Sequence, residues 1–392
     1  MEKESRVPLN IILLGVVSFL NDLSSEIIMP ILPLFITSLG GTGIAIGLIG
    51  GLRESVTSLL KVFSGYISDK TGKRKILVFS GYLLSSIFKL LLALSKTWQQ
   101  VLVLIGFERI GKGMRDAPRD AIIAESMPQA KGKGFGIHRA FDTAGAILGS
   151  IIAFIFFWFM GLGLRTIIVI AAIIAFTSLI PIYFVSEKKT ARKDITLRLT
   201  LLELPKKLKL FLLISAIFSM ANFSYMFFIL KAQNFFETLF VGTHAKFTIG
   251  IPILLYVLFN IFYASLSIPF GYLSDKIGRK KVLLMGYALF AVTTAGFALF
   301  NSITAFVFLF ALYGIVHAII DANQRAFVSD LSKGYSQGTS LGAYHTITGL
   351  VALPASLIAG AIWQVNPQAT FMYAACVSTI AVIIFVLMRN KL

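Results

Sequence analysis

Residues 65–75 read GYISDKTGKRK, and residues 271–281 read GYLSDKIGRKK. The two segments differ mainly by conservative exchanges, and each lies between two long apolar stretches. A charged segment that recurs between apolar stretches at equivalent points of two halves is typical of membrane proteins built from internal repeats. The sequence therefore predicts a tandem duplication in which each copy of this segment joins two membrane helices.

The composition of the chain also favours a membrane protein. Hydrophobic residues make up 57% of the 392 residues and charged residues only 14%, which is more apolar surface than a soluble core can bury. About 20 apolar residues per helix suffice to cross a hydrocarbon layer of about 30 Å, and the alternation expected of membrane strands is missing. We therefore predict an all-α integral membrane protein with twelve spans, at residues 9–38, 44–67, 76–95, 99–124, 133–160, 164–185, 210–238, 247–271, 281–299, 303–329, 337–362 and 367–388.

The repeat divides the chain into two halves. Residues 1–186 are predicted to form a first bundle of six helices, and residues 210–392 are predicted to form a second. Residues 187–209 between them are polar and basic, as expected of a linker that joins two bundles.

The repeated segment carries the pattern G-x-x-x-D-x-x-G-[RK]-[RK], which resembles the loop between helices 2 and 3 of major facilitator superfamily transporters. The segment from Arg109 to Gly113 is similar to the R-x-x-x-G signature of the fourth helix of this family. The resemblance covers essentially the whole chain. It implies two pseudo-symmetric six-helix bundles, secondary transport by alternating access and no enzymatic activity. The chain has no Walker phosphate loop, so we expect transport to run on gradients without a cofactor.

The distribution of basic residues indicates the orientation of the chain. Most of the 36 Lys and Arg lie near the termini, in the linker and in connections after even-numbered spans, whereas the opposite connections carry only Lys96, Arg165 and Lys246. Positively charged connections stay in the cytoplasm. We therefore expect a multi-pass protein of the cell (plasma) membrane with both termini cytoplasmic. The net charge of +18 then reflects topology, so nucleic acid is not an expected partner.

Charged residues at the ends of the spans are candidates for a gate. They are Asp69, Arg74 and Glu125 in the first half and Asp275, Arg279 and Asp330 in the second. The family resemblance implies that the two aspartates of the repeats cap a neighbouring helix, and that each arginine pairs with the acid that closes the span 99–124 or 303–329. Pairs of this kind are weak enough for reversible closure. The alternative is that these charges only determine topology.

Charges inside the spans indicate where the functional site lies, because each costs about 2.5–3.5 kcal/mol at the bilayer centre unless it faces a partner or a wet cavity. Those nearest the midplane are Asp22, Glu26, Arg53, Glu54, Glu108, Arg109, Arg139 and Asp142. Asp22 and Glu26 share one helix face, and so do His138 and Asp142. We expect the spans 9–38, 99–124 and 133–160 to converge on a polar site, with Asp22, Glu26 and Asp142 as proton-coupling carboxyls.

An alignment of the two halves predicts an asymmetric site. The charged positions Asp22, Glu26 and Arg53 fall opposite Phe223, Phe227 and Phe259. A charged wall that faces an aromatic wall suits an amphipathic organic solute and offers few ligands to a metal. The substrate-binding candidates are Arg53, Arg109, Arg139, Phe223, Phe227, Phe259 and His345.

Several of these features also have structural explanations. Buried ion pairs that fix helix packing would account for Glu54, Glu108, Arg115, Asp116, Arg119, Asp120 and Arg325. The histidines inside spans, His138, His317 and His345, are either titratable groups or packed polar residues. The G-x-x-x-G spacings Gly47–Gly51 and Gly145–Gly149 indicate close helix packing.

Together these observations favour a secondary transporter that exports small amphipathic organic compounds and is coupled to protons. The alternative is uptake or exchange of an organic anion, which the arginines near the midplane favour. A third hypothesis is a non-transporting membrane sensor, which the short tails of the chain disfavour. The expected partners are a small-molecule substrate, protons and the lipid bilayer, and we expect a monomer without a cofactor or metal.

Overall fold

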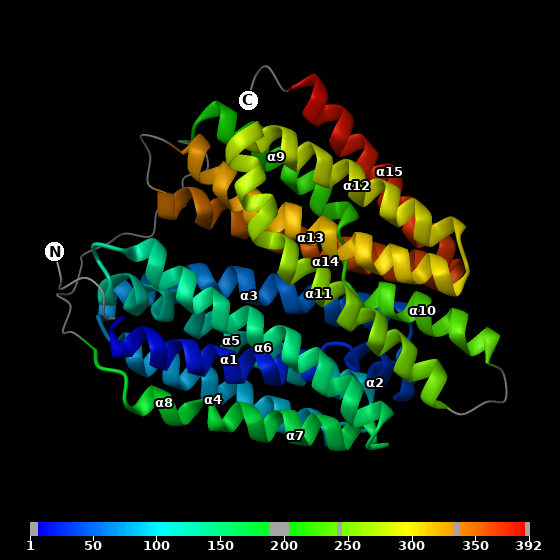
Figure 1. Ribbon diagram of the computed structural model, residues 1–392, viewed down its shortest axis with the longest axis horizontal. Coiled ribbons are helices and arrows are strands. Elements are labelled where there is room, and N and C mark those ends of the chain that lie inside the picture. The colour runs from blue at the N-terminus through cyan, green and yellow to red at the C-terminus, as the bar shows by residue number, and fades with distance from the viewer. Residues whose placement is uncertain (1–6, 188–203, 241–244, 333–336, 389–392) are drawn as a thin grey trace. The chain divides into compact units, whose positions relative to one another are not determined.

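The computed structural model describes residues 7–187, 204–240, 245–332 and 337–388 (Figure 1). Within these ranges the regular secondary structure is helical throughout. The helices are α1 (Leu9–Ile28), α2 (Leu32–Ser38), α3 (Gly43–Thr71), α4 (Arg74–Leu92), α5 (Trp98–Ser126), α6 (Lys131–Trp158), α7 (Leu164–Thr177), α8 (Leu179–Tyr183), α9 (Lys206–Ala221), α10 (Met226–Leu239), α11 (Ala245–Ile277), α12 (Arg279–Leu299), α13 (Ile303–Leu331), α14 (Gln337–Val365) and α15 (Pro367–Leu387).

These helices reproduce the predicted spans. Three spans each consist of two shorter helices, namely α1 with α2, α7 with α8, and α9 with α10. In the described ranges, 11 helical stretches are long and apolar enough to cross a membrane. The long helix outside that set is α5, whose apolar sequence is interrupted by charges between Glu108 and Asp120. The twelve-helix membrane fold predicted from the sequence is confirmed.

The chain folds into two compact units. The first unit comprises Met1–Ile31 and Val56–Leu197, and the second comprises Leu32–Ser55 and Arg198–Leu392. Helix α2 and the first part of α3 therefore group with the second unit, although they belong to the first half of the sequence. The domain limits predicted from the repeat stay a prediction, and most of the predicted linker lies outside the described residues.

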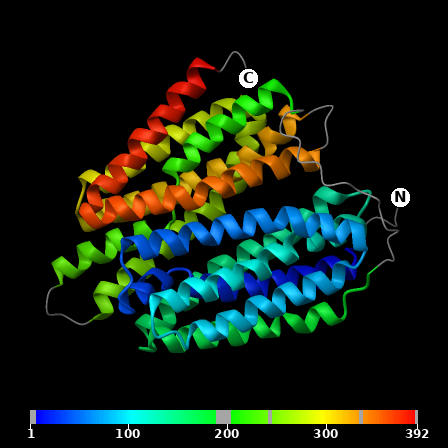
Figure 2. The same ribbon diagram turned by 180° about the vertical axis from the view of Figure 1, so that it is seen from behind.

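In the first unit, α1 packs along α6, α4 packs along α5, and α7 contacts both α1 and α4 (Figure 1, Figure 2). Two glycines of α6 permit the close approach of α1. A Cβ atom on Gly145 would lie 2.5 Å from the carbonyl oxygen of Phe19, and one on Gly149 would lie 2.5 Å from that of Leu23. Any side chain at these positions would push the helices apart, so the predicted packing role of Gly145 and Gly149 is confirmed.

In the second unit, α11 packs along α13, while α12 contacts α13 and α15. Helix α9 contacts α14 and α15, and α10 contacts α2 and α11. The first part of α3 lies against α14 through glycines. A Cβ atom on Gly51 would lie 2.7 Å from the Cα atom of Leu353, and one on Gly47 would overlap the carbonyl oxygen of Ser356. The predicted packing role of Gly47 and Gly51 is confirmed.

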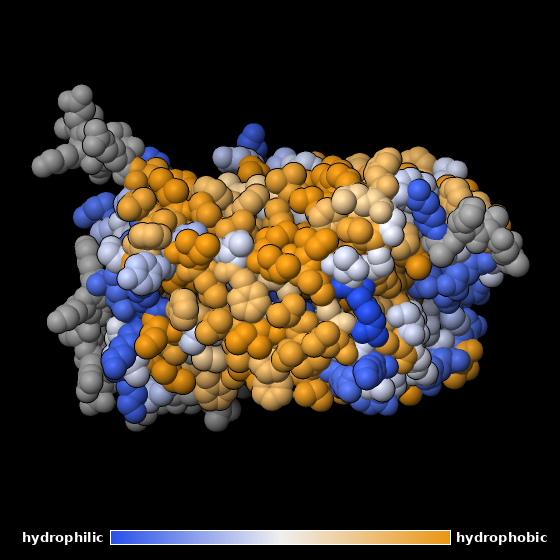
Figure 3. Space-filling view, turned by 90° about the horizontal axis from the view of Figure 1, so that it is seen from below, coloured by the Kyte–Doolittle hydropathy of each residue, from blue (hydrophilic) through white to orange (hydrophobic). Residues whose placement is uncertain are grey.

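The surface of the protein is suited to lipid. On the face seen in Figure 3, hydrophobic residues form a broad band, and hydrophilic residues gather toward the ends of that band. Large apolar side chains are exposed on many helices, for example Ile173 on α7, Val292 on α12 and Ile383 on α15. A soluble protein rarely exposes so much apolar surface. In a bilayer the same surface meets hydrocarbon.

Candidate functional site

Arg74, the first residue of α4, is the charged centre of the first repeated segment. Its guanidinium lies 3.2 Å from a carboxylate oxygen of Asp69, near the end of α3, and also forms an ion pair with Glu125, near the end of α5. The side chain of Arg74 is 6% exposed, whereas those of Asp69 and Glu125 are 41% and 39% exposed. One buried cation thus ties three helices together. The expected pairs are present, and their role as a gate stays a prediction.

Arg279 makes the corresponding contacts in the second unit. Its guanidinium lies 3.1 Å from Asp275 and 2.9 Å from Asp330, and it donates a hydrogen bond of 2.8 Å to the carbonyl of Ala326. The side chain of Arg279 is 26% exposed, so this pair is more open to solvent than that of Arg74. Exposed ion pairs contribute little to stability because water screens their charges.

The two arginines do not occupy equivalent positions of the repeat. Arg74 aligns with Lys280, and Arg279 aligns with Lys73. Each arginine is instead the first residue of its helix, because α4 begins at Arg74 and α12 begins at Arg279. The start of the helix, more than the position in the repeat, therefore places the guanidinium beside its two carboxylates.

The N-terminus of α4 carries a cap that the sequence did not indicate. The carboxylate of Glu187, which follows α8, accepts hydrogen bonds from the backbone N–H groups of Arg74 and Lys75. The ammonium group of Lys75 donates to the carbonyl of Tyr183 at 2.7 Å. Carboxylates stabilise helix N-termini in this way. Asp69 accepts a hydrogen bond from the side chain of Arg74 instead, and its capping of a further helix stays a prediction.

Asp22 on α1 lies among the charges of the first unit. It is partly buried, and it interacts electrostatically with Asp142 on α6 and with the α5 cations Lys112, Arg115 and Arg119. Helices α1, α5 and α6 therefore converge on a polar site, as the sequence predicted. A neighbouring carboxylate disfavours the ionised form of a carboxyl and neighbouring cations favour it, so Asp22 lies between opposing electrostatic influences.

His138 and Asp142 share one face of α6. The Nδ1 atom of His138 lies 3.5 Å from the carboxylate of Asp142, and the two side chains are 5% and 14% exposed. Glu26, one turn beyond Asp22 on α1, lies against Gly149 of α6. Arg139 is exposed, whereas its neighbour His138 is buried, so the two residues lie on different faces of α6.

Helix α5 carries a row of ion pairs. The Nε atom of Arg109 lies 2.7 Å from the carboxylate of Glu108, and Arg119 lies 3.7 Å from Asp116 and 2.9 Å from Asp120. All three contacts join residues within α5, and a role of these charges in fixing helix packing stays a prediction. Arg109, which matches the family signature, is 5% exposed, and its substrate-binding role stays a prediction.

Arg115 contacts groups on α4. It is 1% exposed, its Nη1 atom donates to the hydroxyl of Ser85 at 2.9 Å, and its guanidinium carbon lies 4.0 Å from the centre of the Tyr82 ring. A cation over the face of a ring is attracted by the quadrupole of the ring. These contacts hold the guanidinium of Arg115 against α4.

Lys89 on α4 is a buried charge that sequence reasoning missed. It is 3% exposed, and its ammonium nitrogen lies 2.8 Å from the hydroxyl of Ser25, 3.2 Å from that of Ser24 and 3.4 Å from the amide oxygen of Asn21. All three partners lie on α1. Two acids interact electrostatically with this lysine, Glu108 on α5 and Asp22 on α1. The available signal was the lysine itself, because a charge within an apolar span is costly wherever it occurs.

Arg53 and Glu54 lie on the first part of α3. Arg53 is 3% exposed, whereas Glu54 is exposed. Both belong to the second unit, while Arg109 and Arg139 belong to the first. A common substrate site that includes these three arginines stays a prediction.

The aromatic residues predicted to bind substrate lie in the core of the second unit. The ring centre of Phe223 lies 5.4 Å from that of Phe227 and 5.9 Å from that of Phe371. Phe227 in turn lies 5.4 Å from Trp363. Phe223 is 3% exposed and Phe227 is fully buried. The aromatic half of the predicted site is therefore present as packed core, and its contact with a substrate stays a prediction.

A polar cluster interrupts this aromatic core between α11 and α13. The ring of Phe259 lies 5.6 Å from that of His317, and Tyr313 lies 4.7 Å from the same histidine. The Nδ1 atom of His317 lies 3.8 Å from Asp321, whose carboxylate accepts a 2.8 Å hydrogen bond from the hydroxyl of Tyr263. Asp321 and His317 are therefore polar contacts in an otherwise aromatic environment.

A second polar network lies between α12, α13 and α14. The amide of Gln324 donates to the hydroxyl of Tyr287 at 2.7 Å, and the hydroxyl of Tyr344 donates to Gln324 at 2.6 Å. The ring of His345 lies 5.3 Å from that of Tyr344. His345 is thus placed beside this network, and its role in substrate binding stays a prediction.

The chemistry of the described residues differs between the two units. The first unit holds carboxyls among cations within apolar helices, whereas the second holds packed aromatic rings with few charges. Among the residues that the structure describes, no group of three or more His, Cys, Asp and Glu is placed to hold a metal ion.

Comparison with known proteins places the whole chain in one family. The sequence profile of the Major Facilitator Superfamily matches residues 14–242 and 212–391. An uncharacterized MFS-type transporter of Methanocaldococcus jannaschii is 54% identical over 381 residues, which cover 97% of this chain and 95% of that protein. A multidrug resistance protein MdtH of Proteus mirabilis is 30% identical over 178 residues, which cover 43% of each protein.

Solved structures share the fold. A variant of the nucleoside transporter NupG has a TM-score of 0.82 at 15% identity and covers 97% of this chain and 99% of its own. The POT family transporter PepTSo has a TM-score of 0.80 at 12% identity and covers 98% of both chains. At these identities the likeness concerns the fold alone.

Profile, relative and fold agree along nearly the full length of the chain. The protein is accordingly a multi-pass membrane transporter of small molecules and not an enzyme, as the repeated segment and the twelve spans predicted. The chain belongs to the major facilitator superfamily.

Proposed function

We propose that this transporter exports a small amphipathic organic solute, such as a drug or a metabolite, in exchange for protons. The observation that carries the proposal is the polar site of the first unit, where Asp22 lies among the cations of α5 and near Asp142. Carboxyls that are held in an apolar span and balanced by nearby cations can take up and release protons as their neighbours move. We assign proton coupling to Asp22, Glu26 and Asp142.

Coupling follows from the charge balance of this site. Protonation of Asp22 removes a negative charge from the vicinity of Lys112, Arg115 and Arg119. These cations then attract another carboxylate or a polar group of the solute. Because a ligand shifts a conformational equilibrium only through its different affinities for the two states, a proton and a solute that change the same charge balance become linked.

The aromatic second unit supports an amphipathic substrate. We propose that the solute contacts the arginines of the sequence prediction through its polar part and aromatic rings through its apolar part. The proposed substrate-binding residues are Arg53, Arg109, Arg139, Phe223, Phe227, Phe259 and His345. The partial relatives named multidrug resistance protein MdtH support efflux of such compounds.

We further propose that the ion pairs of the two repeated segments act as a latch. The residues are Asp69, Arg74 and Glu125 in the first unit and Asp275, Arg279 and Asp330 in the second. Each set joins the ends of three helices through one guanidinium, so a movement of any of these helices breaks the pairs. Solvent-exposed pairs reform readily, as a reversible gate requires.

Uptake or exchange of an organic anion is the second candidate. It is favoured by the cations inside the first unit, because Lys89 and Arg115 contact neutral groups in addition to their acidic neighbours. An anionic substrate would complete the charge balance of such a site. Competition by anionic ligands that weakens with ionic strength would support this candidate over the exporter.

The membrane orientation is also part of the proposal. We propose that both termini are cytoplasmic, that the chain resides in the plasma membrane and that it works as a monomer. In a Cys376→Ser background, Lys70→Cys should react with an impermeant maleimide only after the membrane is opened. Lys96→Cys should react in intact cells, and the reverse pattern would invert the assignment.

Transport by purified protein in proteoliposomes tests the proposed function. A panel of labelled amphipathic cations, zwitterions and anions is offered under an imposed pH gradient, without a gradient, and in counterflow with unlabelled solute. With the pH gradient imposed, a proton-coupled exporter accumulates its substrate in the vesicles while protons leave them down their gradient. In counterflow it exchanges labelled for unlabelled solute. Counterflow without any response to the pH gradient would contradict proton coupling and favour the anion exchanger.

A further inference from the structure

The turn between α4 and α5 lies at the opposite end of the first unit from the Arg74 segment. Helix α4 begins at Arg74 and leads to this turn, and α7 begins beside it and leads toward Tyr183, whose carbonyl binds Lys75. Two surface grooves open here, and both include Leu94. Neither groove contains a residue assigned above to coupling, substrate binding or the latch.

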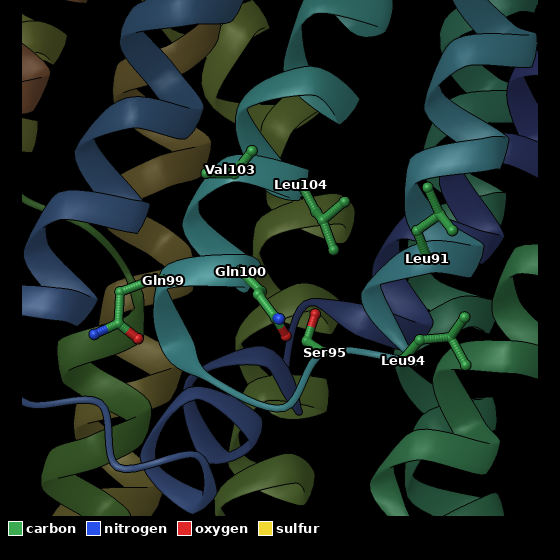
Figure 4. Close-up of a pocket in the computed structure, with 7 residues that line it drawn as sticks. All are labelled: Leu91, Leu94, Ser95, Gln99, Gln100, Val103 and Leu104. Atoms are coloured by element: carbon green, nitrogen blue, oxygen red, sulfur yellow. The ribbon is translucent and has the colours of Figure 1, made fainter.

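The first groove is apolar and has a volume of about 500 Å³. It is lined by Leu91, Leu94, Ser95, Gln99, Gln100, Val103 and Leu104. Figure 4 shows Leu91 and Leu94 on the α4 side and Val103 and Leu104 on α5, with Ser95 and Gln100 together at one end. Leu94 is 67% exposed and Val103 is 55% exposed, so these side chains contact whatever fills the groove. The volume lies in the range of roughly 300–1,000 Å³ that is typical of ligand sites.

The adjacent groove, of about 630 Å³, carries positive charge. Its lining includes Lys96 and Arg165. These are two of the three basic residues that the sequence places in connections on this side of the membrane. Such connections generally avoid Lys and Arg, so two of them in one groove indicate a use for the charge. The Nη1 atom of Arg165 donates to the carbonyl of Ala93 at 2.7 Å, which fixes the guanidinium at the edge of the groove.

The start of α7 adds further attraction for an anion. The N-cap residue of α7 is Gly163, which provides no side-chain cap, and Arg165 and Thr166 lie in its first turn. Backbone N–H groups at a helix N-terminus favour negative charge. On the cytoplasmic side of membranes, basic pockets between helices bind phosphate headgroups of lipids, and the same attraction between opposite charges acts at the other membrane surface. An anion site beside an apolar groove, in a protein surrounded by bilayer, fits an amphiphile with a phosphate head.

We propose that this end of the first unit binds an anionic phospholipid. Its phosphate lies between Lys96 and Arg165, and one of its hydrocarbon chains occupies the groove formed by Leu91, Leu94, Val103 and Leu104. The proposal is independent of the transported substrate and of the direction of transport.

Native mass spectrometry of the purified chain tests this proposal. The protein is titrated with phosphatidylglycerol and with phosphatidylcholine of identical chains, and inorganic phosphate is titrated separately. We expect phosphatidylglycerol to bind more tightly than phosphatidylcholine. Lys96→Gln and Arg165→Gln should each weaken the binding of phosphatidylglycerol about fivefold, and the double variant about 25-fold. Each basic residue near a membrane surface contributes a factor of about this size to the affinity.

Two further variants separate the charge from the groove. Lys246→Gln removes the third basic residue on the same side of the membrane and lies outside both grooves, so it should leave the affinity unchanged. Val103→Trp fills the apolar groove and leaves all charges in place, so it should weaken the binding of phosphatidylglycerol. If the double variant fails to fold, Lys96→Gln alone, at an exposed side chain, still tests the fivefold loss.

Three outcomes would overturn the proposal. Equal affinity of the wild-type chain for the two lipids would show that the headgroup charge is not recognised. An equal loss in Lys246→Gln would attribute the effect to net charge. Complete displacement of phosphatidylglycerol by millimolar inorganic phosphate would assign the groove to a free anion.

Discussion

At the scale of single residues, the latch arginines differ in burial although they have similar partners. Arg74 is 6% exposed at its side chain and Arg279 is 26% exposed. Removing one member of a buried pair leaves the other charge without compensation, whereas removing a solvent-exposed pair costs little. Loss of the Arg74 pairs should therefore reduce stability and transport more than loss of the Arg279 pairs.

We predict that Arg74→Ala lowers the free energy of unfolding by about 1–2 kcal/mol, because Asp69 and Glu125 lose a buried partner but still reach water. Transport turnover should be lost while ligand binding remains. Arg279→Ala is the matched control and should cost less than about 1 kcal/mol. Thermal unfolding in detergent measures the loss of stability, and uptake by proteoliposomes measures the loss of turnover. Equal losses in Arg74→Ala and Arg279→Ala would contradict the expected effect of burial.

Lys89 belongs to the same scale and leads to a second prediction. Its contacts on α1 are with neutral oxygens, and the hydroxyl of Ser25 also donates to the carbonyl of Asn21. A lysine charge buried in a membrane span costs free energy, and neutral partners lose less from its removal than a paired carboxylate does. We therefore expect Lys89→Met to unfold at the same temperature as wild type or higher, with transport reduced at least about tenfold.

The control for this prediction is Lys61→Met. Lys61 is 32% exposed at its side chain and lies 4.0 Å from Asp120, so its loss should change stability and turnover only slightly. A clear destabilisation of Lys89→Met, with normal turnover by the folded fraction, would show that Lys89 serves only to hold α1 against α4.

At the scale of helices, hydropathy predicted the spans well because lipid imposes one length and one kind of backbone pairing. The sequence indicated the close packing of Gly47 and Gly145, since their spacing is typical of contacting helices. It did not indicate the cap by Glu187 on α4. That contact joins segments more than a hundred residues apart, and a carboxylate at a chain turn has no local pattern that identifies its partner.

Helix packing leads to a third prediction. Gly47 of α3 has no room for a side chain, because the carbonyl of Ser356 on α14 occupies that space. Gly47→Val should therefore force the two helices apart, at a cost of about 1–3 kcal/mol for overpacking. An equilibrium that depends on this contact would shift by roughly 5- to 150-fold. We expect a lower unfolding temperature and altered turnover.

Gly342 provides a matched control on α14 itself. A Cβ atom at this position would meet nothing within 4 Å, so Gly342→Val should fold and transport like wild type. The hydroxyl of Ser55 donates to the carbonyl of Gly349 in the same helix pair, so Ser55→Ala should weaken the contact without adding volume. Normal stability and turnover of Gly47→Val would show that α3 and α14 need not approach closely.

At the scale of the whole molecule, the duplication has kept the helices and changed their chemistry. Alignment of the halves predicted this asymmetry, because Asp22 and Phe223 occupy equivalent positions. The charged cluster is found in the first unit and the packed aromatic rings in the second. What the alignment could not predict is which charges contact each other. Those contacts depend on helix rotation, as the different faces of His138 and Arg139 illustrate.

Coupling is a property of the whole transport cycle, and we expect one carboxyl to dominate it. Among the three candidates, Asp22 has both an acidic neighbour, Asp142, and a set of cationic neighbours on α5. Glu26 lies against Gly149, where α1 and α6 approach closely. A proton on Asp22 changes the charge balance with Asp142 and with the three cations of α5. We expect Asp22 to dominate coupling.

Asp22→Asn should therefore abolish the response of transport to a pH gradient and preserve counterflow, because exchange needs the helices to move but no net proton transfer. Glu26→Gln on the same helix face is the comparison variant, and a larger loss of the pH response there would make Glu26 the dominant carboxyl. The measurement is uptake by proteoliposomes after a pH jump, beside counterflow at constant pH. A normal pH response in Asp22→Asn, Glu26→Gln and Asp142→Asn alike would remove proton coupling from this cluster. Exchange of organic anions that bind to the cations Lys89 and Arg115 would then be the better proposal for the function of this site.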